Sequence, residues 1–101
     1  MCKMYISLNK KDDRSYNEMT SFVDKICEES CFVKTGNEEY CLLPDTPPAG
    51  ALLVLVSYFE RYQWIVPNIS TWKYIDEDGE EENALATYMR MKKKDNIRDI
   101  S

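Results

Sequence analysis

Histidine is absent from this chain of 101 residues, and its only glycines are the isolated Gly36, Gly50 and Gly79. Without an imidazole there is no Ser-His or Cys-His pair, no histidine metal ligand and no ordinary general base near neutral pH. Isolated glycines do not form the glycine-rich loop that cradles a phosphate group. The sequence therefore predicts a protein that is not an enzyme.

Long apolar segments are also missing. The longest apolar run, residues 49–59, is too short to span a bilayer, which takes about 20 residues. The first residues alternate between apolar and polar, so they lack the continuous apolar core of a signal peptide. We therefore expect a cytoplasmic protein without membrane contact, in which cysteines stay reduced. The four thiols are Cys2, Cys27, Cys31 and Cys41.

The cysteines do not have the spacing of a zinc site. Cys27 and Cys31 are separated by three residues, whereas zinc ribbons and fingers use paired knuckles with shorter spacing. Cys27 falls on the apolar face of a predicted helix, and Cys2 on that of a predicted strand. We interpret these two cysteines as small hydrophobic side chains and expect no metal and no cofactor.

The composition is that of an ordinary folded domain, with 44% hydrophobic and 31% charged residues. A chain of this length suits a single domain and buries roughly 65% of the surface of its unfolded state. No repeat or linker interrupts it. We predict one domain over residues 1–101, with a frayed tail over residues 95–101.

The first part of the chain shows two periodic patterns. Apolar residues alternate strictly through residues 2–9, which predicts a half-buried strand. Ser15 and Glu18 then fit a capping box at the start of a helix. After them, apolar residues recur at the three- and four-residue spacing of an amphipathic helix. They are Met19, Phe22, Val23, Ile26 and Cys27.

Three further strands are predicted. Residues 31–35 and 39–43 are short β-like runs on either side of Gly36 and Asn37, which favours a β-hairpin. Residues 69–75 are rich in β-forming side chains and predict another strand.

Residues 51–63 fit either a buried strand or an amphipathic helix. We favour the helix, because the apolar residues share one helical face and a proline stands where a first turn tolerates it. Asp45 or Thr46 would then cap the helix. After the helix, residues 64–66 are expected to be extended and Pro67 to break the chain.

A last helix is predicted over residues 83–94. Glutamates stand at its start and basic residues at its end, as the helix dipole favours. Asp78 would be the N-cap and Glu81 its reciprocal partner. The resulting order, β-α-β-β-α-β-α, predicts an α+β domain with a mainly antiparallel sheet and helices packed on one side. The basic residues are Arg90, Lys92, Lys93, Lys94 and Arg98.

Acidic residues are concentrated between positions 76 and 82, where six of seven side chains are carboxylates. They account for all of the net charge of −5. Such a patch attracts basic partners or holds a cation. A calcium loop of the EF-hand type is excluded, because Tyr74 and Leu85 would stand at its first and twelfth ligand positions.

An acidic and aromatic surface for binding a basic protein site is the leading functional hypothesis. Aromatic side chains serve as interface anchors, and the sequence pI of about 4.7 argues against direct nucleic-acid binding. The candidate residues are Trp72, Tyr74, Asp76, Glu77, Asp78, Glu80 and Glu81. Of these, Asp76 and Glu77 are the ones without a structural explanation in the predicted helix start.

A small phage-encoded inhibitor of a nucleic-acid-handling defence protein, of the anti-CRISPR or anti-restriction type, would fit this size and charge. The analogy does not rest on a motif. Two alternatives stay open. One is an immunity protein or antitoxin that neutralises a toxin. The other is a structural domain that forms a homodimer or larger homo-oligomer.

Overall fold

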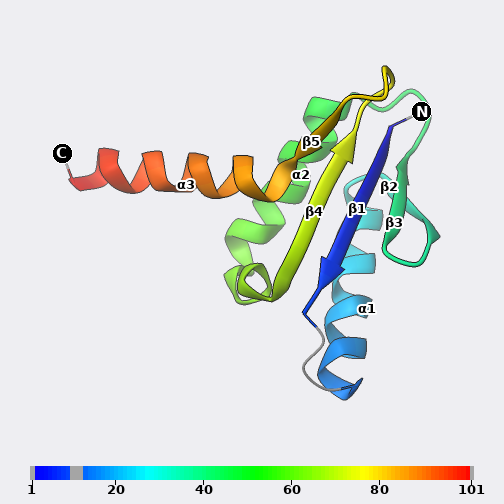
Figure 1. The fold of residues 1–101 in the computed structure, drawn as a ribbon, viewed down its shortest axis with the longest axis horizontal. Helices are drawn as coiled ribbons and strands as arrows, with labels where there is room; N and C mark the ends of the chain where they lie inside the picture. The colour runs from blue at the N-terminus through cyan, green and yellow to red at the C-terminus, as the bar shows by residue number, and fades with distance from the viewer. Residues whose placement is uncertain (1, 10–12, 101) are drawn as a thin grey trace.

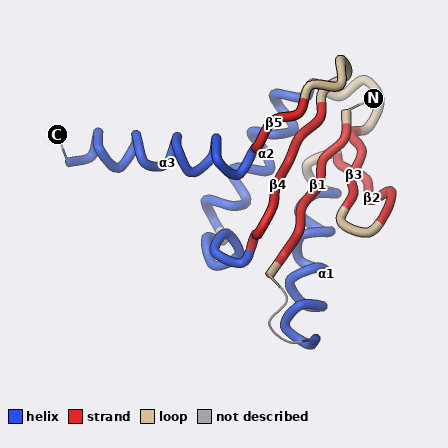
Figure 2. Tube along the Cα trace, in the orientation of Figure 1, coloured by secondary structure: helices blue, strands red, loops and turns tan. Residues whose placement is uncertain are grey.

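The computed structural model describes residues 2–9 and 13–100 (Figure 1). Figure 2 shows how helices and strands alternate along these residues. In chain order the elements are β1 (Lys3–Leu8), α1 (Asp13–Glu29), β2 (Phe32–Gly36), β3 (Glu39–Leu42), α2 (Pro48–Arg61), the 3-10 helix η1 (Gln63–Asn68), β4 (Ile69–Ile75), β5 (Glu81–Asn83) and α3 (Ala84–Ile100).

The five strands form one antiparallel sheet in the order β2-β3-β1-β4-β5. In the centre, Lys3 of β1 lies opposite Cys41 of β3 on one side and Ile75 of β4 on the other. The first four strands with α1 and α2 have the β-α-β-β-α-β connectivity of ferredoxin-like domains. The predicted α+β domain with an antiparallel sheet is confirmed, and β5 and α3 extend it at the β4 edge.

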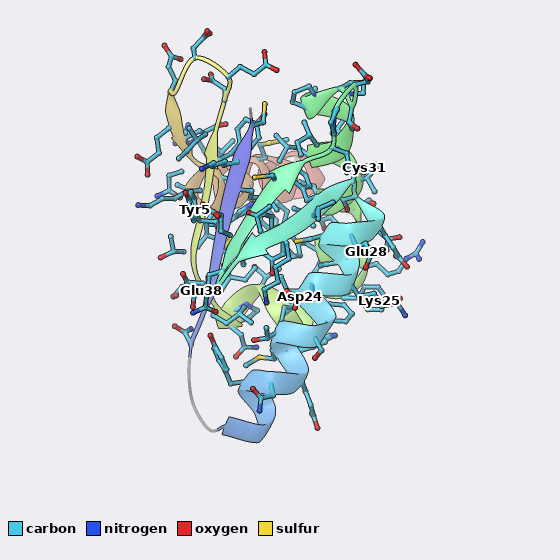
Figure 3. All side chains as sticks on the ribbon, turned by 90° about the vertical axis from the view of Figure 1, so that its right-hand side faces the viewer. Tyr5, Asp24, Lys25, Glu28, Cys31 and Glu38 are labelled. Atoms are coloured by element: carbon cyan, nitrogen blue, oxygen red, sulfur yellow. The ribbon has the colours of Figure 1, made fainter. Side chains whose placement is uncertain are left out.

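Helices α1 and α2 cover one face of the sheet, and no described helix covers the other (Figure 1). Figure 3 shows Tyr5 on the side of the strands away from Glu28 of α1. The core lies between the layers. Met4 of β1, Val23 of α1 and Leu55 of α2 are fully buried in it.

The periodic patterns of the first part of the chain are confirmed, but the capping box is wrong. Helix α1 begins at Asp13, so Ser15 lies inside it rather than at the N-cap. The longer helix places Tyr16 where its hydroxyl donates a hydrogen bond to Glu38, at 3.2 Å. A contact with a distant hairpin is not visible in a local capping pattern.

The predicted hairpin is confirmed with its turn one residue later. Asn37 and Glu38 form the turn instead of Gly36 and Asn37, and Glu38 takes a positive φ of 65°. That conformation is uncommon for a residue with a side chain. The Glu38 carboxylate accepts hydrogen bonds from the hydroxyls of Ser7, at 2.8 Å, and Tyr16, so contacts with β1 and α1 stabilise it.

Residues 51–61 are helical within α2, as favoured, whereas Tyr62 is the C-cap and Gln63 begins η1. The predicted cap is wrong, because Pro47 occupies the N-cap position without a side-chain hydrogen bond and Pro48 begins the helix. Asp45 takes a positive φ of 62° in the preceding turn, which removes it from the capping position. The fixed φ of proline at the first helical position suits this start.

The predicted extended segment at residues 64–66 is also wrong, because it belongs to η1. Coiling this segment buries Ile65 and Val66 while Trp64 stays half exposed. The Asn68 side-chain amide donates to the Trp64 carbonyl at 2.9 Å and closes the turn. Pro67 is accommodated inside η1 rather than breaking it.

Strand β4 forms over residues 69–75 as predicted, whereas the start of the last helix differs. Residues expected in its first turn form β5, and α3 begins at Ala84. The Asn83 side-chain oxygen accepts the backbone N–H of Ala86 at 3.1 Å, so Asn83 caps the helix. Helix α3 continues to Ile100, past the predicted end, and fraying of its tail stays a prediction.

Candidate functional site

The acidic segment forms the loop of the β4–β5 hairpin, which extends beyond the end of the sheet (Figure 1). Asp76 organises this loop, because its Oδ1 atom accepts the backbone N–H groups of Asp78, at 2.9 Å, and Glu80, at 3.0 Å. The N–H of Gly79 donates to the Asp76 carbonyl at 3.1 Å. Gly79 has a positive φ of 85°, which glycine adopts without steric cost.

Three carboxylates of this loop, those of Glu77, Asp78 and Glu80, are exposed. Within the described residues they form no hydrogen bond or ion pair through their side chains. The next two are engaged: Glu81 pairs with Lys73 at 3.1 Å, and Glu82 accepts the Thr87 hydroxyl at 3.1 Å. The loop therefore presents a fixed group of three unpaired negative charges, which we call the acidic triplet.

The carboxylates that have a structural role are not the ones that the sequence predicted. The sequence explained Asp78 and Glu80–82 by a helix start, but that helix begins after them. Asp76 is instead the residue with a structural role, as the acceptor that shapes the loop. Glu77 remains without a structural partner among the described residues.

The aromatic part of the predicted surface is wrong. Trp72 and Tyr74 have only 2% and 7% of their surface exposed, and Trp72 packs edge-on against Phe59 with ring centroids 5.0 Å apart. Burial raises the pKa of the Tyr74 hydroxyl. The alternation of β4 could have shown this, because it places Lys73 on the opposite face from both aromatic residues.

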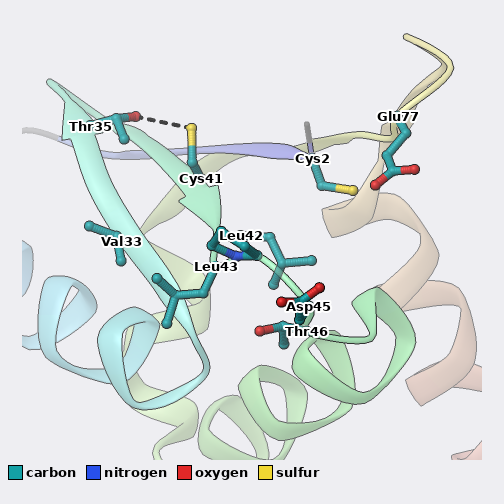
Figure 4. Close-up of a pocket in the computed structure, with 10 residues that line it drawn as sticks. Cys2, Val33, Thr35, Cys41, Leu42, Leu43, Asp45, Thr46 and Glu77 are labelled. Carbon is teal, nitrogen blue, oxygen red and sulfur yellow. Dashed lines mark hydrogen bonds between the residues drawn. The ribbon is translucent and has the colours of Figure 1, made fainter.

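A depression of about 460 Å³ lies beside the acidic loop, between the start of β1, the end of β3 and the segment before α2. Figure 4 shows the Cys2 side chain pointing toward Glu77, with Asp45 nearby on the α2 side. The walls are largely apolar, and Leu43, 42% exposed, is one of them. The sequence alone does not indicate this depression, because its residues come from distant parts of the chain.

The chemistry of this depression suits a basic side chain. Lysine and arginine combine an apolar stem with a charged end. The stem would pack on Leu43 and Pro44, and the charged end would reach the carboxylates of Glu77 and Asp45, which line the same depression. A neutral apolar ligand would leave both carboxylates without a partner.

The open face of the sheet does not form a cationic surface. Its two lysines are paired, Lys3 with Glu39 at 3.7 Å and Lys73 with Glu81 at 3.1 Å. The Tyr5 hydroxyl donates to Glu39 at 2.8 Å, and this hydrogen bond raises the pKa of Tyr5. The Glu39 carboxylate beside Tyr5 would repel the phosphate groups of a nucleic acid.

The thiols do not form a metal centre in the described part of the chain. No three metal-ligating side chains come together there. Burial raises the pKa of Cys27, which disfavours the thiolate. Cys41 is partly exposed, and its sulfur lies 3.5 Å from the Thr35 hydroxyl.

No protein-family model matches this sequence, and neither the curated proteins nor the solved structures contain a match. None of the described helices has the length and apolarity needed to cross a membrane. The acidic triplet and the adjoining depression are thus the features from which a function can be argued.

Proposed function

We propose that this protein is a non-enzymatic binding protein whose acidic hairpin occupies a basic site on another protein. The observation that carries the proposal is the acidic triplet, Glu77, Asp78 and Glu80, held in a loop that Asp76 shapes. A preorganised group of charges loses little conformational freedom on binding. It also steers a basic partner into place before contact.

The depression beside Glu77 adds specificity to this proposal. A partner that inserts one lysine or arginine there buries the stem of that side chain against Leu43 and Pro44. The remaining basic residues of the partner face the acidic triplet. The shape of the depression and the charge of the loop then both determine which partner binds, whereas an acidic loop alone would attract any cation.

A protein that handles nucleic acids is the proposed partner. Such proteins present clusters of basic residues to phosphate groups, and a fixed row of carboxylates offers them similar charge. Binding would exclude the nucleic acid, so the protein would act as an inhibitor. The cytoplasm is the proposed location, because it keeps the four free cysteines reduced.

Charge reversal in the loop tests the proposal. Asp76 is unsuitable for this purpose, because its carboxylate shapes the loop. Glu80→Lys changes the acidic triplet and leaves Asp76 intact. Glu28→Lys is the matched control, since Glu28 is exposed on α1, away from the hairpin, and gives the same change in net charge.

The measurement has two steps. Affinity capture from the source cells with wild type, Glu80→Lys and Glu28→Lys identifies a partner that only the loop variant loses. Titration of that purified partner should then show roughly tenfold weaker binding for Glu80→Lys, and salt should weaken the wild-type complex. Equal affinity of all three proteins, or simultaneous binding of nucleic acid by the partner, would contradict the proposal.

A further inference from the structure

An apolar groove of about 330 Å³ runs between α2 and α3, away from the acidic triplet. Trp72 and Glu82 are among the residues that line it. Two large apolar side chains in its walls are mostly exposed, Leu53 of α2 at 67% and Met91 of α3 at 55%. Exposed apolar surface of this kind commonly marks a site of association.

Helix α3 forms one wall of this groove and leaves it open to solvent. Ala84 and Tyr88 in its first turns are buried against the core, and Tyr88 lies near the rings of Phe59 and Trp72. The rest of α3 extends away from the domain (Figure 1). One side of the helix therefore continues from the core into solvent without a covering element among the described residues.

We infer that this groove is the interface of a homodimer, in which the α3 helices of two copies pack antiparallel across a two-fold axis. The α3 residues that line the groove are symmetric about the midpoint between Thr87 and Tyr88: Ala84 and Thr87 precede it, Tyr88 and Met91 follow it. In an antiparallel pair, the small Ala84 of one copy lies opposite the large Met91 of the other. An isologous interface requires this self-complementarity.

Charge complementarity supports a second copy as the occupant. Glu81 and Glu82 precede α3, whereas Arg90 and Lys92 stand farther along it. Within one chain Glu82 accepts the Thr87 hydroxyl and Lys92 lies over the Tyr88 ring, and among the described residues the two form no ion pair with each other. In the antiparallel pair, Glu82 of one copy comes within about one residue of register of Lys92 of the other.

Lys92 is positioned for such a contact. Its ammonium group lies 5.9 Å from the centroid of the ring of Tyr88, a residue that lines the groove. It has no ion pair within the described residues. The dimer would supply one from the partner copy.

Met91 and Leu53 of the second copy would enter the groove while the helices pack over it. This inference goes beyond the proposed function and does not depend on it, because the triplet lies at the other end of β5.

The first experiment measures the oligomeric state of the full chain by light scattering and sedimentation over a wide range of concentration. We expect a dimer that dissociates on dilution. Met91→Glu should raise the dimer dissociation constant at least tenfold, whereas Met89→Glu should not change it. Met89 is the matched control, because it is 51% exposed on the same helix but does not line the groove.

The second experiment tests the charge pairing without changing the apolar surface. Glu82→Lys and Lys92→Glu should each weaken the homodimer, because like charges then face one another. An equimolar mixture of the two variants should form a heterodimer with both pairs restored. Circular dichroism shows whether each variant is folded. If Met91→Glu does not fold, the mixture of the two charge variants still tests the interface.

Three outcomes would overturn the inference. A monomer at every concentration would mean that a different molecule, or none, covers the groove. A dimer that Met91→Glu leaves intact would use another surface. A mixture of the charge variants that stays monomeric would contradict the antiparallel register. The effect of Glu80→Lys on partner binding tests the proposed function and not the homodimer.

Discussion

Asp76 is joined to Glu80 by two hydrogen bonds across the hairpin loop. The Asp76 backbone N–H donates to the Glu80 carbonyl at 3.0 Å, and the Asp76 carboxylate accepts the Glu80 backbone N–H at 3.0 Å. One carboxylate thus fixes the loop on which Glu77, Asp78 and Glu80 stand. The carboxylate that shapes the loop and the exposed carboxylates of the acidic triplet lie side by side in one acidic run.

Asp76→Ala should destabilise the domain by about 1 kcal/mol, because two backbone N–H groups lose their acceptor. Urea denaturation measures this change in the free energy of unfolding. Glu77→Ala is the control and should lie within about 0.5 kcal/mol of wild type, as expected for an exposed surface residue. Equal effects of the two substitutions would show that Asp76 does not shape the loop.

Asn83→Ala should cost about 1 kcal/mol of stability, because the Ala86 N–H loses its N-cap acceptor. Thermal unfolding followed by circular dichroism measures this loss. Asp78→Ala should have little effect, since Asp78 does not cap α3. A larger loss for Asp78→Ala than for Asn83→Ala would place the start of the helix where the sequence predicted it.

Leu55→Ala should destabilise the domain by about 2–5 kcal/mol, because it opens a cavity in the core. Val54→Ala, one residue away, should change stability by less than about 0.5 kcal/mol. Leu55 is fully buried and Val54 is 42% exposed on the same helix. A similar effect of both substitutions on the urea midpoint would contradict the orientation of α2.

Stability should fall as the pH rises from 10 to 12. Burial, and next the negative charge of Glu60, raise the pKa of the Tyr88 hydroxyl from 10.0 to about 12. A raised pKa in the folded state contributes stability below the unfolded pKa, and this contribution is lost as the pH rises through the folded value. Tyr88→Phe should therefore lose less stability than wild type over this window, measured by denaturant midpoints. Parallel losses would contradict the assignment.

The elements that the sequence predicted well are those with a strong local pattern. Met4 and Ile6 alternate with polar residues in β1, and Val23 and Ile26 follow the helical period in α1. Burial of one face imposes such a pattern wherever the element lies. The alternation in β4 also indicates that Trp72 lies on the buried face of the sheet, although the functional hypothesis placed Trp72 on the exposed surface.

The sequence by itself determined the α+β class, the order of the main elements and the concentration of negative charge at residues 76–82. Only the tertiary structure decided the role of each carboxylate. Pairing of β5 with β4 moved the helix start from Asp78 to Ala84, and folding brought Cys2, Leu43 and Glu77 around one depression. Local propensity cannot show these features, because they depend on hydrogen bonds and contacts between residues distant in sequence.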